Sequence, residues 1–125
     1  MKQEMSVFNT IPKSDWLFET VEFFAIYDKY PTSNGHLLII SKECVHDYFE
    51  LSGNQKQDLI MALEKGREML QKIFAPDGYN IGMNCGEAAG QTVFHFHCHI
   101  IPRYIGDIED PRGGVRHAVI GKGYY

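Results

Sequence analysis

The sequence has little of what a membrane-bound or secreted protein needs. Its longest apolar runs, residues 23–27 and 37–40, are far shorter than the ~20 residues of a bilayer-spanning helix. Its first residues contain no apolar core of signal-peptide length. The three cysteines, Cys44, Cys85 and Cys98, are odd in number and form no CxxC pair, unlike a disulfide framework. These absences predict a reduced, cytoplasmic protein with no membrane partner.

Excess positive charge is also missing. The chain carries 12 Lys and Arg against 16 Asp and Glu, for a net charge of -4. Binding along a nucleic acid requires an excess of positive charge, so no nucleic-acid partner is expected. The 125 residues are 44% hydrophobic and 22% charged, which suits one ordinary core. We expect one domain over residues 1–125, of which residues 104–125 form a segment rich in Gly, Pro and charge.

Apolar patterning predicts a mixed structure. Short apolar or alternating runs indicate strands over residues 16–20, 23–27, 36–40, 79–84 and 92–101. The small, Gly-rich connection between the last two strands suggests an antiparallel hairpin. Ser41 is placed to cap a short helix that reaches Phe49. The expected fold class is α+β, with an antiparallel sheet of about five strands, one long helix and one short helix.

The long helix is predicted from its cap and its apolar face. Ser52 and Gln55 match a capping box, and the turn that starts at Pro76 ends the helix. Apolar residues recur on one helical face, with Gly66 among them, at Leu59, Leu63, Leu70 and Ile73. This face is expected to pack on the sheet.

Three histidines alternate in the last predicted strand, at positions 95, 97 and 99. Alternate side chains of a strand point to one face, so we expect His95, His97 and His99 on one surface and Cys98 in the core. Imidazole, with an ordinary pKa near ~6.5, can act as nucleophile, acid or base at neutral pH. It is also a common zinc ligand. The pattern therefore indicates either group-transfer chemistry or a metal site.

The loop before these histidines favours the first interpretation. Residues 85–89 are mostly small, and Gly90, Gln91 and Thr92 follow directly. Such a loop can present backbone N–H groups to an anion, and the Thr92 hydroxyl adds a donor. Beside three imidazoles, this composition suggests a phosphate bound next to a nucleophile.

Residues 90–103, Gly-Gln-Thr-Val-Phe-His-Phe-His-Cys-His-Ile-Ile-Pro-Arg, resemble the signature of the histidine-triad (HIT) family. Residues 34–42, in which Gly35 and His36 precede an apolar strand, are similar to an earlier block of that family. The similarity extends from about residue 7 to residue 103.

The resemblance implies a nucleotidyl hydrolase or transferase that attacks the α-phosphate of a nucleoside derivative and forms a covalent nucleotidyl-histidine. It implies that His97 is the nucleophile and that His99 contacts the phosphate and assists the departing group. By the same resemblance, His95 orients the phosphate, and His36 supports the nucleophile from behind. The implied nucleotide-binding residues are Asp28 at the ribose and Asn84, Gly90, Gln91 and Thr92 at the phosphate.

The resemblance also implies a homodimer in which two sheets join. No cofactor and no metal are expected, because the N-terminal CxxC that accompanies zinc in some family members is absent here. Arg112 and Arg116 either meet distal phosphates of a long substrate or belong to a surface loop, and His46 and His117 are expected to be solvated. Two alternatives stay open: a non-enzymatic nucleotide-binding module, and a metal-binding protein that uses the three histidines. The sequence does not decide whether the substrate is a phosphoramidate, a dinucleoside polyphosphate or another conjugate. It also does not decide between hydrolysis and phosphorolysis.

Overall fold

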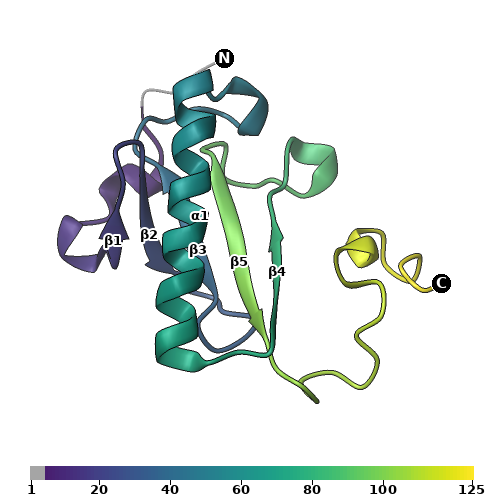
Figure 1. Ribbon diagram of the computed structural model, residues 1–125. Helices are drawn as coiled ribbons and strands as arrows, with labels where there is room; N and C mark the ends of the chain where they lie inside the picture. The colour runs from purple at the N-terminus through teal and green to yellow at the C-terminus, as the bar shows by residue number, and fades with distance from the viewer. Residues whose placement is uncertain (1–4) are drawn as a thin grey trace.

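The computed structural model describes residues 5–125. Its centre is one five-stranded antiparallel sheet with the order β1-β2-β3-β5-β4, and helix α1 lies across one face (Figure 1). The strands are β1 (Phe18–Glu19), β2 (Phe23–Tyr27), β3 (Leu37–Ser41), β4 (Gly78–Gly82) and β5 (His97–Arg103). The expected α+β class and the hairpin of β4 with β5 are therefore confirmed. Within residues 5–125, the structure has no helix that is long and apolar enough to cross a membrane.

Helix α1 (Gly53–Phe74) begins at the expected capping box. The Ser52 hydroxyl accepts the Gln55 N–H, and the Gln55 side chain accepts the Ser52 N–H. Gly66 allows the helix to lie close to the sheet, because a Cβ there would lie 2.9 Å from the Leu37 Cδ2 atom. One expectation is wrong: Ile73 is 59% exposed, whereas Ala62 is fully buried. In the last turn Phe74, rather than Ile73, packs against the core.

The two faces of the sheet carry different cores. The face under α1 holds the larger cluster, which includes Phe23, Ile39, Cys98 and Ile100. Cys98 is fully buried there, as expected, and burial raises its pKa to about 12. The opposite face holds a smaller cluster of Phe24, Leu38 and Ile40, packed against Phe8, Ile11, Trp16 and Ile26. The N-terminal segment thus covers part of the face that lies away from the helix.

Two predicted elements differ from the structure. The short helix after Ser41 does not form: Ser41 ends β3, and its hydroxyl donates to the Glu43 carbonyl over 2.7 Å. A single 3-10 turn, Tyr48–Glu50, follows instead, capped by Asp47. The last strand spans His97–Arg103 instead of the expected residues 92–101, and residues 92–96 belong to an irregular segment. Pro102 fits within β5 because it lies beyond the last pair with β3, Leu37 with Ile100.

The C-terminal segment extends beyond β4 at the edge of the sheet (Figure 1). It contains one 3-10 helix, Gly114–Ala118, which contacts β4. The rest is irregular, as its Gly-rich sequence predicts.

Candidate active site

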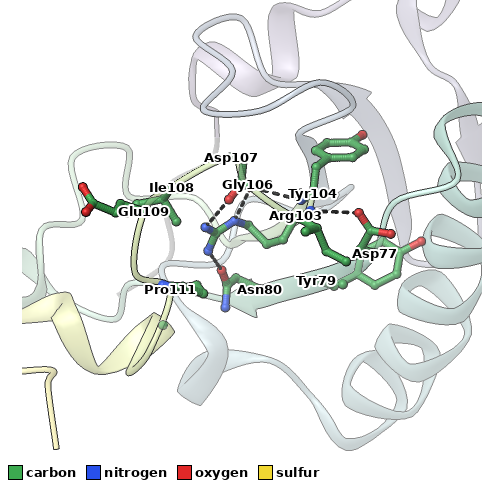
Figure 2. Close-up of a pocket in the computed structure, with 13 residues that line it drawn as sticks. Asp77, Tyr79, Asn80, Arg103, Tyr104, Gly106, Asp107, Ile108, Glu109 and Pro111 are labelled. Atoms are coloured by element: carbon green, nitrogen blue, oxygen red, sulfur yellow. Dashed lines mark hydrogen bonds and ion pairs between the residues drawn. The ribbon is translucent and has the colours of Figure 1, made fainter.

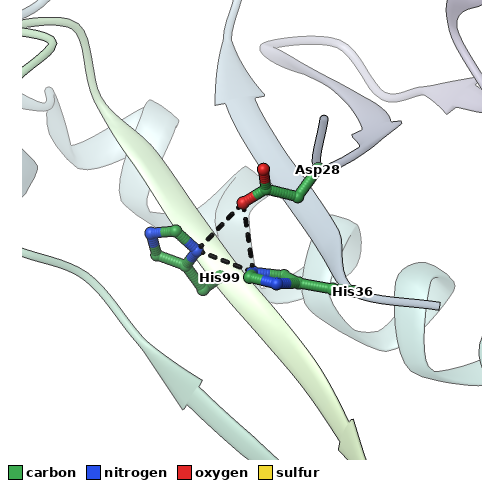
Figure 3. Close-up of side chains that lie close together, drawn as sticks. All are labelled: Asp28, His36 and His99. Carbon is green, nitrogen blue, oxygen red and sulfur yellow. Dashed lines mark hydrogen bonds and ion pairs between the residues drawn. The ribbon is translucent and has the colours of Figure 1, made fainter. Parts of the chain in front are cut away.

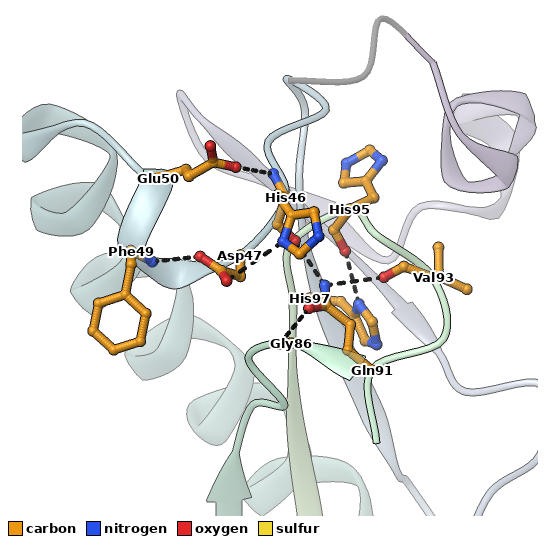
Figure 4. A network of polar contacts seen from close by, with 9 residues as sticks. All are labelled: His46, Asp47, Phe49, Glu50, Gly86, Gln91, Val93, His95 and His97. Carbon is orange, nitrogen blue, oxygen red and sulfur yellow. Dashed lines mark hydrogen bonds and ion pairs between the residues drawn. The ribbon is translucent and has the colours of Figure 1, made fainter. Parts of the chain in front are cut away.

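His97 stands at the start of β5 on the face away from α1. Its Nδ1 atom lies 2.8 Å from the His95 backbone carbonyl oxygen (Figure 4). A carbonyl only accepts hydrogen bonds, so Nδ1 carries the proton and Nε2 keeps its lone pair. No hydrogen bond from residues 5–125 reaches Nε2, and the ring is partly exposed. The Phe8 and His97 rings pack in an edge-to-face arrangement, with their centroids 5.1 Å apart. The structure therefore fixes the Nδ1–H tautomer of the imidazole and leaves Nε2 without a protein partner among the described residues.

His95 differs from the expectation for this motif. It precedes β5, so the alternation of side chains within a strand does not apply to it. Its ring is fully buried, with Nε2 donating to the Ser41 carbonyl over 2.6 Å and Nδ1 accepting the Ser6 hydroxyl over 2.6 Å. Burial lowers its pKa. The buried ring presents no surface to a ligand in this structure, and its backbone carbonyl is the group that contacts His97. A role of His95 in orienting the phosphate stays a prediction.

His99, His36 and Asp28 form a second hydrogen-bonded group (Figure 3). The Thr32 N–H donates to His36 Nδ1 over 3.0 Å, so His36 carries its proton on Nε2. The His36 Nε2–H donates to His99 Nδ1 over 2.9 Å. The Asp28 Oδ2 atom lies 3.4 Å from the same His36 Nε2 atom. His99 therefore carries its own proton on Nε2. The His97 and His99 rings lie 5.4 Å apart, so a free lone pair and an N–H donor are neighbours on one face.

Electrostatics keep His99 neutral. Burial, with the nearby imidazoles of His97 and His36, lowers its pKa to about 4, although Asp28 acts in the opposite direction. Burial also lowers the pKa of His36. At neutral pH the free protein thus holds both rings uncharged, which suits the chain of hydrogen bonds from Thr32 through His36 to His99.

These lowered pKa values make stability depend on pH. The unfolded chain binds protons at its histidines near pH ~6.5, whereas folded His99 binds one only near pH 4. Between these values the unfolded state holds more protons, so stability is expected to fall as the pH falls from 6.5 to 4. His99 alone accounts for roughly 3 kcal/mol across that window. Urea unfolding of wild type and His99→Asn at several pH values gives the free energy of unfolding as a function of pH. If this free energy changes with pH in the same way in both proteins, His99 does not cause the dependence.

A metal centre fits this group poorly. Asp28, His36 and His99 are the group of potential ligands that gathers within residues 5–125, with ligand atoms within 4.8 Å of one another. However, the Thr32 N–H occupies the lone pair of His36 Nδ1, which leaves a proton rather than a lone pair on Nε2. The three histidines of the motif also do not converge, because both nitrogens of His95 are bonded elsewhere. The geometry therefore argues against a metal site built from the motif.

The loop before β5 differs in detail from the expectation. Gln91 is buried: its Oε1 accepts the Gly86 N–H over 2.8 Å, and its Nε2 donates to the His46 carbonyl over 2.7 Å (Figure 4). Gln91 thus shapes the loop rather than presenting its amide to a ligand. Gly90 has a φ of 94°, which favours glycine, and it is exposed. Thr92 and Asn84 are exposed as well.

Three arginines and the two remaining histidines make contacts within the chain. A cavity of about 500 Å³ beside the C-terminal segment contains Arg103, which donates to both Asp107 oxygens over 2.8 Å and to Asn80 over 2.7 Å (Figure 2). The residues that line this cavity do not include His36, His95, His97 or His99. The other contacts are Arg112 with Asp110, Arg116 with the Gly123 carbonyl, and His117 with the Arg112 carbonyl. His46 is not simply solvated, because it stacks on Phe94.

Sequence reasoning missed Ser6, Phe8 and Thr32. Ser6 lies 89 residues from His95, so no local spacing links the two. The one local signal is the capping box that Ser6 forms with Asn9, which predicts a turn but not its partner.

The fold and the site define a class: an α+β protein that presents a histidine with a free ring nitrogen on the face of an antiparallel sheet that lies away from the helix. The HIT domain family model matches residues 10–106, so the chain belongs to the HIT family.

Relatives and solved structures agree with this. A Hit-like protein from Bartonella henselae has a similar structure, with a TM-score of 0.78, 31% identity and coverage of 87% of this chain and 86% of that chain. The bis(5′-nucleosyl)-tetraphosphatase (asymmetrical) of Schizosaccharomyces pombe is 32% identical over 104 residues, which is 82% of this chain and 57% of that protein. The AP-4-A phosphorylase of Mycobacterium tuberculosis is 29% identical over 85 residues, 67% of this chain and 44% of that protein. The chain thus spans about half the length of these two curated relatives.

Proposed function

We propose that this protein is a nucleotidyl hydrolase or transferase that acts through a covalent intermediate on His97. The observation that carries the proposal is the hydrogen bond from His97 Nδ1 to the His95 carbonyl, which leaves Nε2 free beside the His99 N–H donor. The Nε2 lone pair attacks the α-phosphorus of a nucleoside derivative, and the bond from phosphorus to the leaving group breaks. Water or another acceptor then breaks the new P–N bond and regenerates the imidazole.

The surroundings of His97 suit a nucleoside monophosphate unit. Ile40 pairs with His97 across β3 and β5, and Leu38 pairs with His99, so apolar side chains adjoin the imidazoles. Partly buried Ile26 and Phe8 continue this surface toward the N-terminal segment. We place the base along the partly buried side chains of Ile26 and Phe8 and the ribose at Asp28. The exposed side chains of Asn84 and Thr92 lie near the phosphate in this arrangement.

Two relatives bear names that support this substrate class. The Schizosaccharomyces pombe protein is named as a bis(5′-nucleosyl)-tetraphosphatase, and the Mycobacterium tuberculosis protein as an AP-4-A phosphorylase. The first name denotes transfer to water and the second denotes transfer to inorganic phosphate, so the test includes both acceptors. Adenosine phosphoramidates and diadenosine polyphosphates should be incubated with the protein, with and without inorganic phosphate, and the products analysed. Binding of AMP without turnover of any substrate would support a non-enzymatic nucleotide-binding module instead.

Asp28→Ala is expected to weaken binding more than it slows chemistry. Ribose contacts are similar in the ground and transition states, so their loss mainly raises KM. A smaller loss of kcat is expected beside it, because Asp28 Oδ2 also lies 3.4 Å from His36 Nε2 and 3.9 Å from His99 Nδ1. A substrate with deoxyribose should lose its disadvantage in the variant. Steady-state kinetics with ribose and deoxyribose substrates test this. If Asp28→Ala discriminates between them as wild type does, Asp28 does not bind the ribose.

We also propose a homodimer that joins two sheets through β4. In the described part of the chain β4 pairs with β5 alone, and Ile81 is 45% exposed on this edge strand. A free sheet edge is commonly covered by pairing. Light scattering at micromolar concentration is expected to give twice the 14.3 kDa chain mass. A stable monomer would contradict the proposal.

A further inference from the structure

The hydrogen bond that fixes the His97 tautomer depends on a carbonyl outside the sheet. β5 begins at His97, so the backbone of His95 is not part of the ladder. Its neighbour Phe96 is held by a backbone hydrogen bond to Val45 over 2.7 Å. The His95 carbonyl itself points at His97 Nδ1, and its direction depends on how residue 95 is held.

The side chain of His95 is fixed at both ring nitrogens. Nε2 donates to the Ser41 carbonyl at the end of β3, so Nδ1 must be the acceptor and the Ser6 hydroxyl the donor, each over 2.6 Å. The Ser6 oxygen in turn accepts the Phe8 N–H over 3.1 Å. Every polar ring atom of this fully buried imidazole thus has a defined partner. Without the Ser6 hydroxyl, Nδ1 would be a buried acceptor with no donor, which is unfavourable.

We propose that Ser6 is a positioning residue for the nucleophile: its hydroxyl fixes the His95 ring, and the His95 carbonyl consequently holds His97 with its proton on Nδ1 and its lone pair on Nε2. The inference rests on the proposed function of His97. The Ser6 hydroxyl is bonded within the protein, to His95 Nδ1 and to the Phe8 N–H, and we assign its effect on the His97 tautomer to the bond with His95. Phe8, two residues further on, packs its ring edge on both His95 and His97, so the same turn also encloses the nucleophile.

The test compares three variants. Ser6→Ala removes the hydroxyl and is expected to lower kcat at least about tenfold while KM stays within about twofold, because the loss falls on a group that acts in the transition state. Ser6→Thr restores the donor and is expected to restore kcat. Asn9→Ala is the matched control: it breaks the other half of the capping box, the bond from the Ser6 N–H to Asn9 Oδ1, and leaves the hydroxyl in place. It is expected to keep kcat near wild type.

Nitrogen NMR of the imidazoles gives a readout that does not depend on turnover. Wild type should show His97 protonated at Nδ1, and Ser6→Ala should show a mixture of tautomers, with folding checked by circular dichroism. A pure Nδ1–H tautomer in Ser6→Ala, or an equal loss of kcat in Asn9→Ala, would overturn the inference. If wild type forms no nucleotidyl-histidine with any substrate, the proposed function fails, whereas the tautomer measurement still decides the role of Ser6.

Discussion

His97→Asn is expected to abolish nucleotidyl transfer while AMP still binds. Asparagine offers no lone pair comparable to that of imidazole Nε2, so the covalent intermediate cannot form. Loss of a nucleophile typically lowers kcat on the order of 10⁴-fold or more. Binding should survive because the base, ribose and phosphate contacts that we propose come from other residues. Turnover measures the loss, and calorimetry with AMP measures the binding.

Wild type provides the positive half of this experiment. Rapid quenching followed by mass spectrometry should trap a nucleotidyl adduct on His97. His117→Asn is the matched control, because that ring lies in the C-terminal segment and donates to the Arg112 carbonyl. It should turn over as wild type does. Chelators should have no effect on either protein. Retained turnover in His97→Asn, or an adduct on another residue, would refute the assignment of the nucleophile.

His99→Asn is expected to slow reactions with poor leaving groups most. In the free protein His99 is neutral, since its pKa is about 4, and it offers an N–H from Nε2. A bound phosphate adds negative charge beside the ring, which favours its protonated form. The added proton on Nδ1 faces the Asp28 carboxylate, whose Oδ2 lies 3.9 Å from Nδ1 and 3.4 Å from His36 Nε2, so Asp28 can accept from both rings while His99 Nε2 gives its proton to the departing group. Loss of general acid catalysis lowers rates by about 10²–10⁴-fold. Good leaving groups need no proton and should be affected far less.

The measurement is kcat/KM for a series of AMP esters whose leaving groups differ in pKa. Wild type should show a shallow dependence on leaving-group pKa, and His99→Asn a steep one. A uniform loss across the series would mean that His99 has a structural role through His36 instead.

Regular elements of this protein could be predicted from the sequence because their signals are local. The capping box at Ser52 and the apolar period of α1 lie within the helix itself, and both appear in the structure. The strand over residues 23–27 also forms as its composition indicates. His97 and His99 share the open face because both lie within β5, where alternation holds. The apolar period does not decide between neighbouring residues at the end of the helix, and Phe74 takes the core position there while Ile73 is exposed.

The inward turn of His95 could be decided only by the tertiary structure. Alternation predicts a side chain's face only inside a regular strand, and His95 lies before β5 begins. Its partners, Ser6 and the Ser41 carbonyl, are 89 and 54 residues away, and Gln91 reaches the His46 carbonyl over 45 residues. The sequence by itself therefore determined the class of fold, the family and the two imidazoles on the open face. The tertiary structure decided their tautomers, because the hydrogen bonds that fix them join segments with no local pattern in common.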